Sequence, residues 1–219
     1  MEKQTIKTDI TSQSKPVRAV VYDYLRDAIL SGEFKVGEYL RERDLAKKIN
    51  ISTTPIKEAL RQLEQDGIVT TINRKGSLVA DNLMDSLEEI NYARSAIEGV
   101  AAGLAALKIT DDEIKRLEEI IQKIKFFTNE GNREEISKLN KQFHKEIKII
   151  SRNNYIAKQI EAVRSFDEHF RKQALANKGE LEKAYEEHRF ILEKIKSKNY
   201  NNAEKAMRDH IRRTSDRVM

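Results

Sequence analysis

Apolar side chains recur at helical spacing along the first part of the chain. After Pro16 they occupy one face of an expected helix, and this pattern ends at Ser31-Gly32. A short loop follows, and the pattern then predicts a helix of about two turns over residues 43–49. A tight turn leads to a third helix, which begins within Ser52–Pro55 and ends at Asp66-Gly67.

Residues 68–80 show the pattern of a β-hairpin with a basic tip. The segment 68–72 is rich in β-branched residues, Asn73-Arg74-Lys75-Gly76 forms a turn, and the chain then returns. Two short helices joined by a tight turn and followed by such a hairpin are typical of a winged helix-turn-helix, which binds DNA. We therefore expect a DNA-binding domain over residues 16–80 with a small β wing, preceded by a flexible polar arm over residues 1–15.

The third helix presents polar side chains on its outward face: Thr53, Thr54, Lys57, Arg61 and Gln62. Hydroxyl groups at a helix N-terminus suit phosphate oxygens, because backbone N–H groups are unpaired there and the helix dipole attracts anions. Lys57 and Arg61 lie one turn apart and can reach base edges or phosphates. Taken singly, each residue also fits an ordinary solvated helix surface, and it is their combination with the basic wing that favours DNA binding.

Residues 81–219 contain no proline, which favours long helices. Polar breaks divide this part of the chain near residues 109–112, 129–133, 152–154, 176–180 and 197–201. The periodicity predicts about six helices of roughly 15 to 25 residues, and their short connections favour antiparallel neighbours. We therefore expect a mostly α protein whose second domain, residues 81–219, is an all-helical antiparallel bundle.

Several polar side chains occupy inward positions on the apolar faces of these helices. His144, His188 and His210 fall on three different helices, and Asn140 lies one turn before His144. Facing helices of a bundle build metal sites from such side chains, and neutral imidazole is the commonest metal ligand. The pattern predicts a divalent metal site, although a single buried histidine is more often a hydrogen-bonded core residue. Histidines that line a metal-free effector pocket are the alternative.

Arg94 also occupies an inward position, on the first of these helices. A buried cation needs a negative partner, because an unpaired charge in an apolar interior is costly. Glu98, one turn further on, can supply that partner locally. The functional interpretation is that Arg94 faces the same cavity as the histidines and neutralises an anionic effector. Both interpretations are open at this point.

The composition narrows the chemistry further. The chain has no cysteine, which excludes disulfides, cysteine metal sites and a cysteine nucleophile. No segment approaches the roughly 18 apolar residues of a membrane span, and no signal peptide is evident, so we expect a cytoplasmic protein. The net charge of +5 is compatible with nucleic-acid binding but does not establish it. A metal-dependent hydrolase is disfavoured, because the inward faces carry no Asp and Asn140 cannot act as a base.

Two segments, residues 37–46 (GEYLRERDLA) and 52–67 (STTPIKEALRQLEQDG), resemble the DNA-binding domain of the GntR superfamily. The resemblance implies that the DNA contacts are Arg43, Ser52, Thr53, Thr54, Lys57, Lys75 and Gly76. The family usually has arginine where this chain has Thr53 and Lys57, and arginine makes bidentate contacts with guanine that neither residue can copy. DNA binding is therefore expected, but the usual operator sequence of the family is not expected to carry over.

The remainder is similar to the FadR-type (FCD) effector domain, in residues 94–98 (RSAIE), 140–144 (NKQFH), 187–189 (EHR) and 206–211 (AMRDHI). In metal-binding members an Asp or Asn and three histidines hold a divalent metal, and the effector is often a small organic acid. The resemblance implies a site for zinc, nickel or manganese with four ligands: Asn140, His144, His188 and His210. Many members have Asp at the first of these positions, and a neutral amide is a weaker ligand than a carboxylate.

Together the two resemblances imply a transcription regulator, either repressor or activator, and not an enzyme. We expect a homodimer, formed through residues 81–219, on a near-palindromic operator whose half-sites lie roughly one helical turn apart. A small carboxylate bound at the metal site would change operator affinity by a coupling free energy of about 1–3 kcal/mol.

Overall fold

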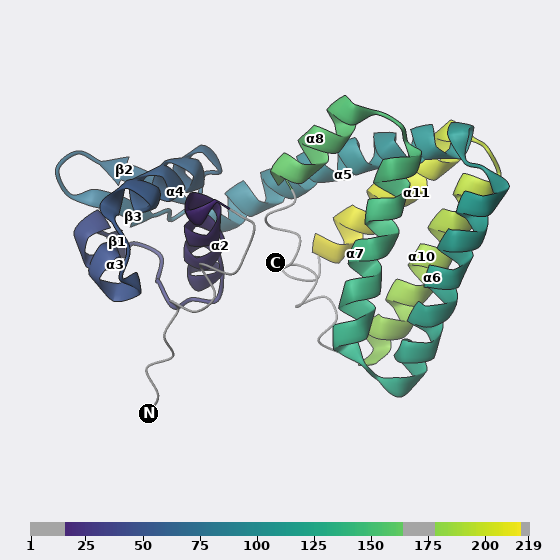
Figure 1. Cartoon of the computed structure of the whole chain (residues 1–219), viewed down its shortest axis with the longest axis horizontal. Coiled ribbons are helices and arrows are strands. Elements are labelled where there is room, and N and C mark those ends of the chain that lie inside the picture. The colour runs from purple at the N-terminus through teal and green to yellow at the C-terminus, as the bar shows by residue number, and fades with distance from the viewer. Residues whose placement is uncertain (1–15, 164–177, 216–219) are drawn as a thin grey trace. The chain divides into compact units, whose positions relative to one another are not determined.

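The computed structural model describes residues 16–163 and 178–215. The chain divides between Leu87 and Glu88 into two compact units (Figure 1). The arm expected over residues 1–15 lies outside the described residues. Within the described ranges, no helix is both long enough and apolar enough to cross a membrane.

Three helices form the body of the first unit: α2 (Val17–Leu30), α3 (Glu42–Ile49) and α4 (Thr53–Gln65). Both α2 and α3 pack against α4, through side chains that include Leu25 and the fully buried Ile56 and Leu63. Apolar residues at helical spacing thus fold onto one small core, as their periodicity predicts. The helix-turn-helix arrangement is confirmed.

The turn between α3 and α4 differs in one detail from the sequence-based expectation. Asn50 ends α3 in the left-handed region (φ 55°), a conformation that asparagine tolerates. Ser52 has the extended backbone of an N-cap residue, but its hydroxyl makes no capping hydrogen bond. A side-chain cap at Ser52, which the serine at the start of this helix would suggest, is therefore not formed. Pro55 in the first turn, where no intrahelical N–H bond is lost, favours the helix start instead.

The wing belongs to a three-stranded antiparallel sheet in the order β1-β3-β2, not to a hairpin alone. The predicted hairpin is confirmed as β2 (Val69–Ile72) and β3 (Gly76–Val79), with Val69 opposite Val79. Strand β1 (Tyr39–Leu40) pairs with the other edge of β3, and two residues are too short to show an alternating pattern. Gly76 has φ +109°, and a Cβ there would lie 2.9 Å from the Leu40 carbonyl oxygen, so this register requires glycine.

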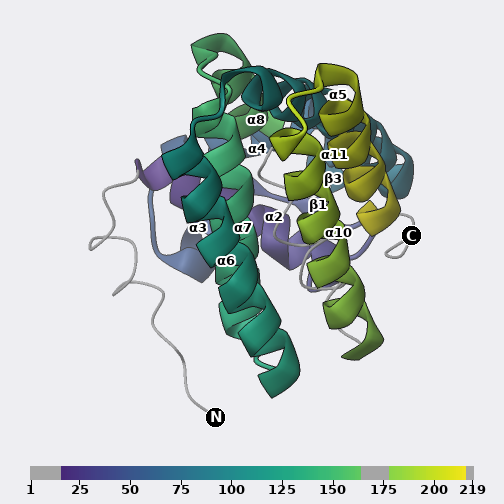
Figure 2. The same cartoon turned by 90° about the vertical axis from the view of Figure 1, so that its right-hand side faces the viewer.

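The second unit is helical throughout its described part, from α5 (Leu83–Lys108), whose first turn belongs to the first unit, to α11 (Tyr200–Ser215). Between them lie α6 (Asp111–Glu130), α7 (Arg133–Ile150), α8 (Asn154–Val163) and α10 (Lys178–Lys196). Helix α6 packs against α7 and α10, and α10 packs against α11 (Figure 2). Four of the predicted breaks coincide with the connections between these helices, and the fifth, near residues 176–180, overlaps the first residues of α10. The helix expected after residue 154 is described only to Val163.

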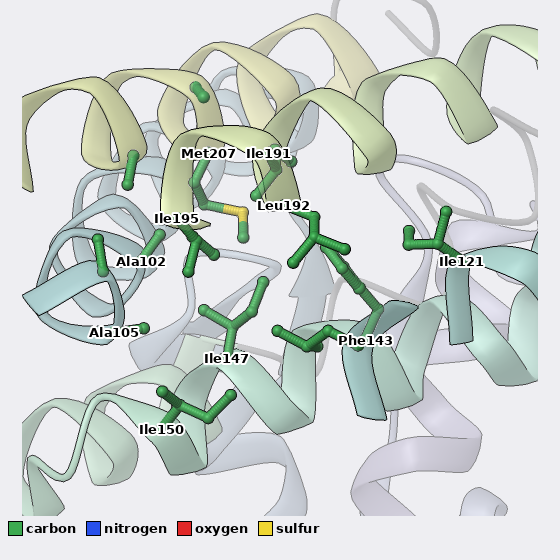
Figure 3. Close-up of a cluster of buried hydrophobic side chains, with 14 of the residues drawn as sticks. Ala102, Ala105, Ile121, Phe143, Ile147, Ile150, Ile191, Leu192, Ile195 and Met207 are labelled. Carbon is green, nitrogen blue, oxygen red and sulfur yellow. The ribbon is translucent and has the colours of Figure 1, made fainter. Parts of the chain in front are cut away.

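A continuous apolar core joins α5, α6, α7, α10 and α11 (Figure 3). Phe143 and Ile147 of α7 point toward Leu192 and Ile195 of α10, and all four side chains are buried. On α5 the facing residues are small alanines, which allow close helix packing. The core therefore fixes the rotation of each helix, and with it the inward direction of the polar residues one turn away.

This core makes a direct prediction for two neighbouring isoleucines of α7. Ile147 is 1% exposed and Ile149 is 52% exposed. Ile147→Ala should lower the free energy of unfolding by about 2–5 kcal/mol, because it leaves a cavity in the core. Ile149→Ala should change it by less than about 0.5 kcal/mol. Urea unfolding followed by far-UV circular dichroism measures both, and equal losses would contradict the assigned rotation of α7.

Candidate functional site

A cleft of about 770 Å³ in the first unit lies between α3, α4 and the wing. It brings together four of the predicted DNA contacts: Arg43 of α3, Lys57 of α4, and Lys75 and Gly76 of the wing. The other predicted contacts do not line this cleft. Ser52, Thr53 and Thr54 are exposed at the N-terminal end of α4, and Arg61 is exposed one turn beyond Lys57.

The cleft has a surplus of positive side chains that are free for a partner. Five cations line it, against the carboxylates of Glu42 and Asp44: Arg41, Arg43, Lys57, Arg74 and Lys75. None of these five forms an ion pair within the described residues, whereas the buried Arg26 of the same unit pairs with Asp23 and Asp27. Unpaired cations around a concave surface suit the phosphates of a nucleic acid.

Sequence reasoning did not single out two of these cations, Arg41 and Arg74. Arg74 was visible as part of the basic wing turn but was not named as a contact. Arg41 directly follows β1, and β1 itself was not predicted. No sequence signal placed Arg41 beside the wing, because the pairing of β1 with β3 is what brings it there.

In the second unit, three of the predicted metal ligands lie close together in the interior of the helical domain. His144 comes from α7, His188 from α10 and His210 from α11, and one ring nitrogen of each lies within 4.8 Å of the others. His188 is fully buried and His210 is 6% exposed. Phe143 packs edge-on against the His188 ring at 5.0 Å, so the apolar core backs the cluster. The inward placement expected from the helical pattern is thus what the structure shows.

Each histidine uses its Nδ1 atom to bond an oxygen: His144 to Glu98 Oε2 (2.7 Å), His188 to the Ala184 carbonyl (2.6 Å) and His210 to Glu187 Oε2 (2.8 Å). A carbonyl or ionised carboxylate oxygen only accepts, so Nδ1 carries the hydrogen and the lone pair of a neutral ring lies on Nε2. The Nε2 atoms of His144 and His188 face one another at 3.4 Å. Two facing lone pairs repel unless a proton or a cation lies between them.

Asn140 lies on the same face of α7 as His144, one turn earlier. It is 5% exposed, and its Oδ1 atom is buried without a hydrogen-bond partner among the described residues. A buried acceptor without a partner is costly and uncommon in folded proteins. Imidazole nitrogens and an amide oxygen are ligand types that suit a divalent metal such as zinc or nickel.

Burial and neighbouring charges shift the pKa values of two groups in the cluster. Burial lowers the pKa of His210 to about 4, although its hydrogen bond to Glu187 acts in the opposite direction, so this ring is neutral at pH 7. Burial also opposes ionisation of Glu98, but the charges of Arg94 and His144 outweigh it and hold the pKa of Glu98 below its usual value. The cluster therefore contains a neutral imidazole at His210 and an ionised carboxylate, Glu98, that bonds His144.

Arg94 is where the pattern predicts it, inside the domain and 5% exposed. Its Nε atom donates to Glu98 Oε1 at 2.7 Å, so the local partner expected from spacing is present. Sequence reasoning did not find that the same Glu98 bonds His144, nor that Glu187 bonds His210. The sequence pattern linked Glu98 only to Arg94, which lies one turn earlier on the same helix. Glu187 precedes His188 in the sequence, and no periodic pattern connects it to His210 on α11.

Comparisons with known proteins agree with both halves of this description. Residues 18–79 match the family model "Bacterial regulatory proteins, gntR family", and residues 89–213 match the FCD domain. An uncharacterized HTH-type transcriptional regulator of Bacillus subtilis, YdhC, is 30% identical over 86% of this chain and 85% of its own. The HTH-type transcriptional repressor RspR of Escherichia coli is 23% identical over 98% of this chain and 93% of its own.

A solved structure shows the same fold. Escherichia coli McbR/YncC superposes with a TM-score of 0.63 at 23% identity, covering 91% of this chain and 95% of that one. The matched families and the named relatives are transcription regulators and not enzymes, which confirms the expectation of a non-catalytic protein. This chain belongs to the gntR family of bacterial regulatory proteins, with an FCD domain following its winged helix-turn-helix.

Proposed function

We propose that the FCD domain of this DNA-binding transcription regulator senses a small organic acid through a bound divalent metal ion, and that sensing changes operator affinity. The observation that carries the proposal is the convergence of the three histidine rings, each held by a hydrogen bond at Nδ1, with one ring nitrogen of each within 4.8 Å of the others. The buried Oδ1 atom of Asn140 supports it, because a cation is the partner this acceptor lacks.

The residues that would hold the ion are Asn140, His144, His188 and His210. A bound zinc, nickel or manganese ion would supply positive charge and open coordination positions for a carboxylate. Around that ion, Glu98 and Glu187 orient two of the rings, and the apolar core behind Phe143 excludes water. Arg94 adds a buried positive charge, held by Glu98, that favours an anionic effector over a neutral one.

For the DNA-binding domain, we propose that α4 lies in the major groove and the wing lies along the neighbouring backbone. Ser52, Thr53 and Thr54 then meet phosphates at the α4 N-terminus, and Lys57 and Arg61 reach base edges or phosphates. Arg43, Lys75 and Gly76 line the cleft beside the wing. A homodimer would present two such surfaces to a near-palindromic operator, with half-sites roughly one helical turn apart.

The metal site predicts how metal content responds to two substitutions. Purified wild-type protein should retain about one zinc, nickel or manganese ion per chain, and His144→Ala should lose it. Asn140→Asp should bind the metal on the order of tenfold more tightly, because a charged oxygen replaces the neutral amide oxygen. Elemental analysis and competition with a chromogenic chelator measure these effects. Wild-type protein that holds no metal after incubation with divalent ions would favour a metal-free effector pocket.

The basic cleft predicts different effects for two lysines of the first unit. On double-stranded DNA selected by the wild-type protein from a random library, Lys57→Ala should weaken binding by about 1–3 kcal/mol. Lys75→Ala should reduce the slope of log affinity against log salt by about 1, as expected for one lost phosphate contact. Lys48→Ala is the control, because that lysine already pairs with Glu33 outside the cleft. Fluorescence anisotropy at several salt concentrations measures all three, and similar losses for Lys48 and Lys57 would contradict the assigned DNA surface.

Effector sensing predicts that operator affinity depends on small carboxylates only when metal is present. In a titration of metal-loaded protein, at least one small organic acid should shift operator affinity by about 5- to 150-fold. The same acid should have no effect on the His144→Ala protein. No shift with a panel of mono-, di- and tricarboxylates at saturation would count against an organic-acid effector.

A further inference from the structure

Two arginine–glutamate–histidine chains lead to the histidine cluster, one through Glu98 and one through Glu187. In the first, Glu98 accepts from Arg94 Nε at 2.7 Å through Oε1 and from His144 Nδ1 at 2.7 Å through Oε2. In the second, Glu187 accepts from His210 Nδ1 at 2.8 Å and pairs with an Arg213 nitrogen at 3.1 Å. Each carboxylate is thus shared between a guanidinium group and an imidazole.

The two chains differ in how strongly water screens the arginine. The Arg94 side chain is 6% exposed and that of Glu98 is 9% exposed, so their pair is nearly dry. The Arg213 side chain is 48% exposed, so water already competes for its charge. Replacing Arg94 therefore changes the electrostatic environment of Glu98 far more than replacing Arg213 changes that of Glu187.

A shared carboxylate links the strength of its two hydrogen bonds. Glu98 holds His144 less strongly while part of its charge is engaged by Arg94, and more strongly when that engagement ends. A stronger acceptor at Nδ1 makes the imidazole a better donor to metal at Nε2. Glu98 thus connects Arg94, the proposed anion-binding group, to His144, one of the proposed metal ligands.

We propose that Glu98 couples the effector to the metal: an anion that draws Arg94 away from Glu98 strengthens the hold of His144 on the ion. This inference rests on the metal-dependent effector site proposed above. Because binding linkage is reciprocal, the metal tightens anion binding by the same factor. Glu98 acts as a positioning residue, through His144, and does not itself touch the ion.

A double-mutant cycle on the full chain tests this coupling with zinc alone as the probe. Glu98→Gln should weaken zinc binding by about 10- to 100-fold. Arg94→Gln should tighten it by about fivefold or more, because Glu98 is then left to His144 alone. In the Glu98→Gln background, Arg94→Gln should have no further effect. Arg213→Gln is the matched control at the second chain and should leave zinc affinity nearly unchanged.

Acetate serves as the anion probe in the same titrations. It should raise zinc affinity in the wild-type protein more than in Glu98→Gln. Equal gains from acetate in both proteins would overturn the proposal. So would equal tightening by Arg94→Gln with and without Glu98, which is the signature of direct repulsion between Arg94 and the ion.

Folding and the proposed function are controlled separately. Circular dichroism checks each variant, and Arg94→Lys replaces Arg94→Gln if the latter does not fold. The lysine keeps the charge but loses the Nε–H bond to Glu98, so it should tighten zinc binding in the same direction and by less. Wild-type protein that binds no zinc would remove the metal site itself, whereas zinc binding without the coupling would remove only the role of Glu98.

Discussion

The second domain depends on one recurrent interaction, the hydrogen bond from histidine Nδ1 to an oxygen acceptor. It places a hydrogen on Nδ1 of each ring, and one ring nitrogen of each histidine lies within 4.8 Å of those of the other two. Without those acceptors each ring could adopt either tautomer, and the cluster would have no defined donor set. The acceptors come from two helices, Glu98 from α5 and Ala184 and Glu187 from α10, so the helical packing and the chemistry of the site are parts of the same arrangement.

Among the residues that the structure describes, charged side chains are paired in the interior of the helical domain and unpaired in the cleft of the DNA-binding domain. In the helical domain the buried carboxylates at the cluster are held by arginine and histidine, so each buried negative charge has positive or hydrogen-bonded neighbours. In the DNA-binding domain the cleft keeps five cations without ion pairs among the described residues. The charges of the interior are thus paired, whereas the unpaired charges of the cleft suit the phosphates of DNA, as proposed above.

Much of this arrangement follows from periodicity in the sequence. A histidine on the apolar stripe of a long helix has to point inward, so spacing alone placed His144, His188 and His210 inside the domain. Periodicity gives the direction of a side chain but not its partner across the fold, which is why the bonds made by Glu98 and Glu187 were missed. Strand β1 was not predicted for a related reason. Its two residues, Tyr39 and Leu40, form a strand only by pairing with β3, which lies far along the sequence.

We propose that three histidine nitrogens and Asn140 hold a divalent metal. X-ray absorption spectroscopy at the zinc edge, on protein loaded with one equivalent of zinc, tests it most directly. The account predicts three imidazole nitrogens at about 2.0–2.1 Å, with the multiple scattering of imidazole rings and light oxygen donors completing the shell. A first shell of oxygen atoms without imidazole scattering would contradict it.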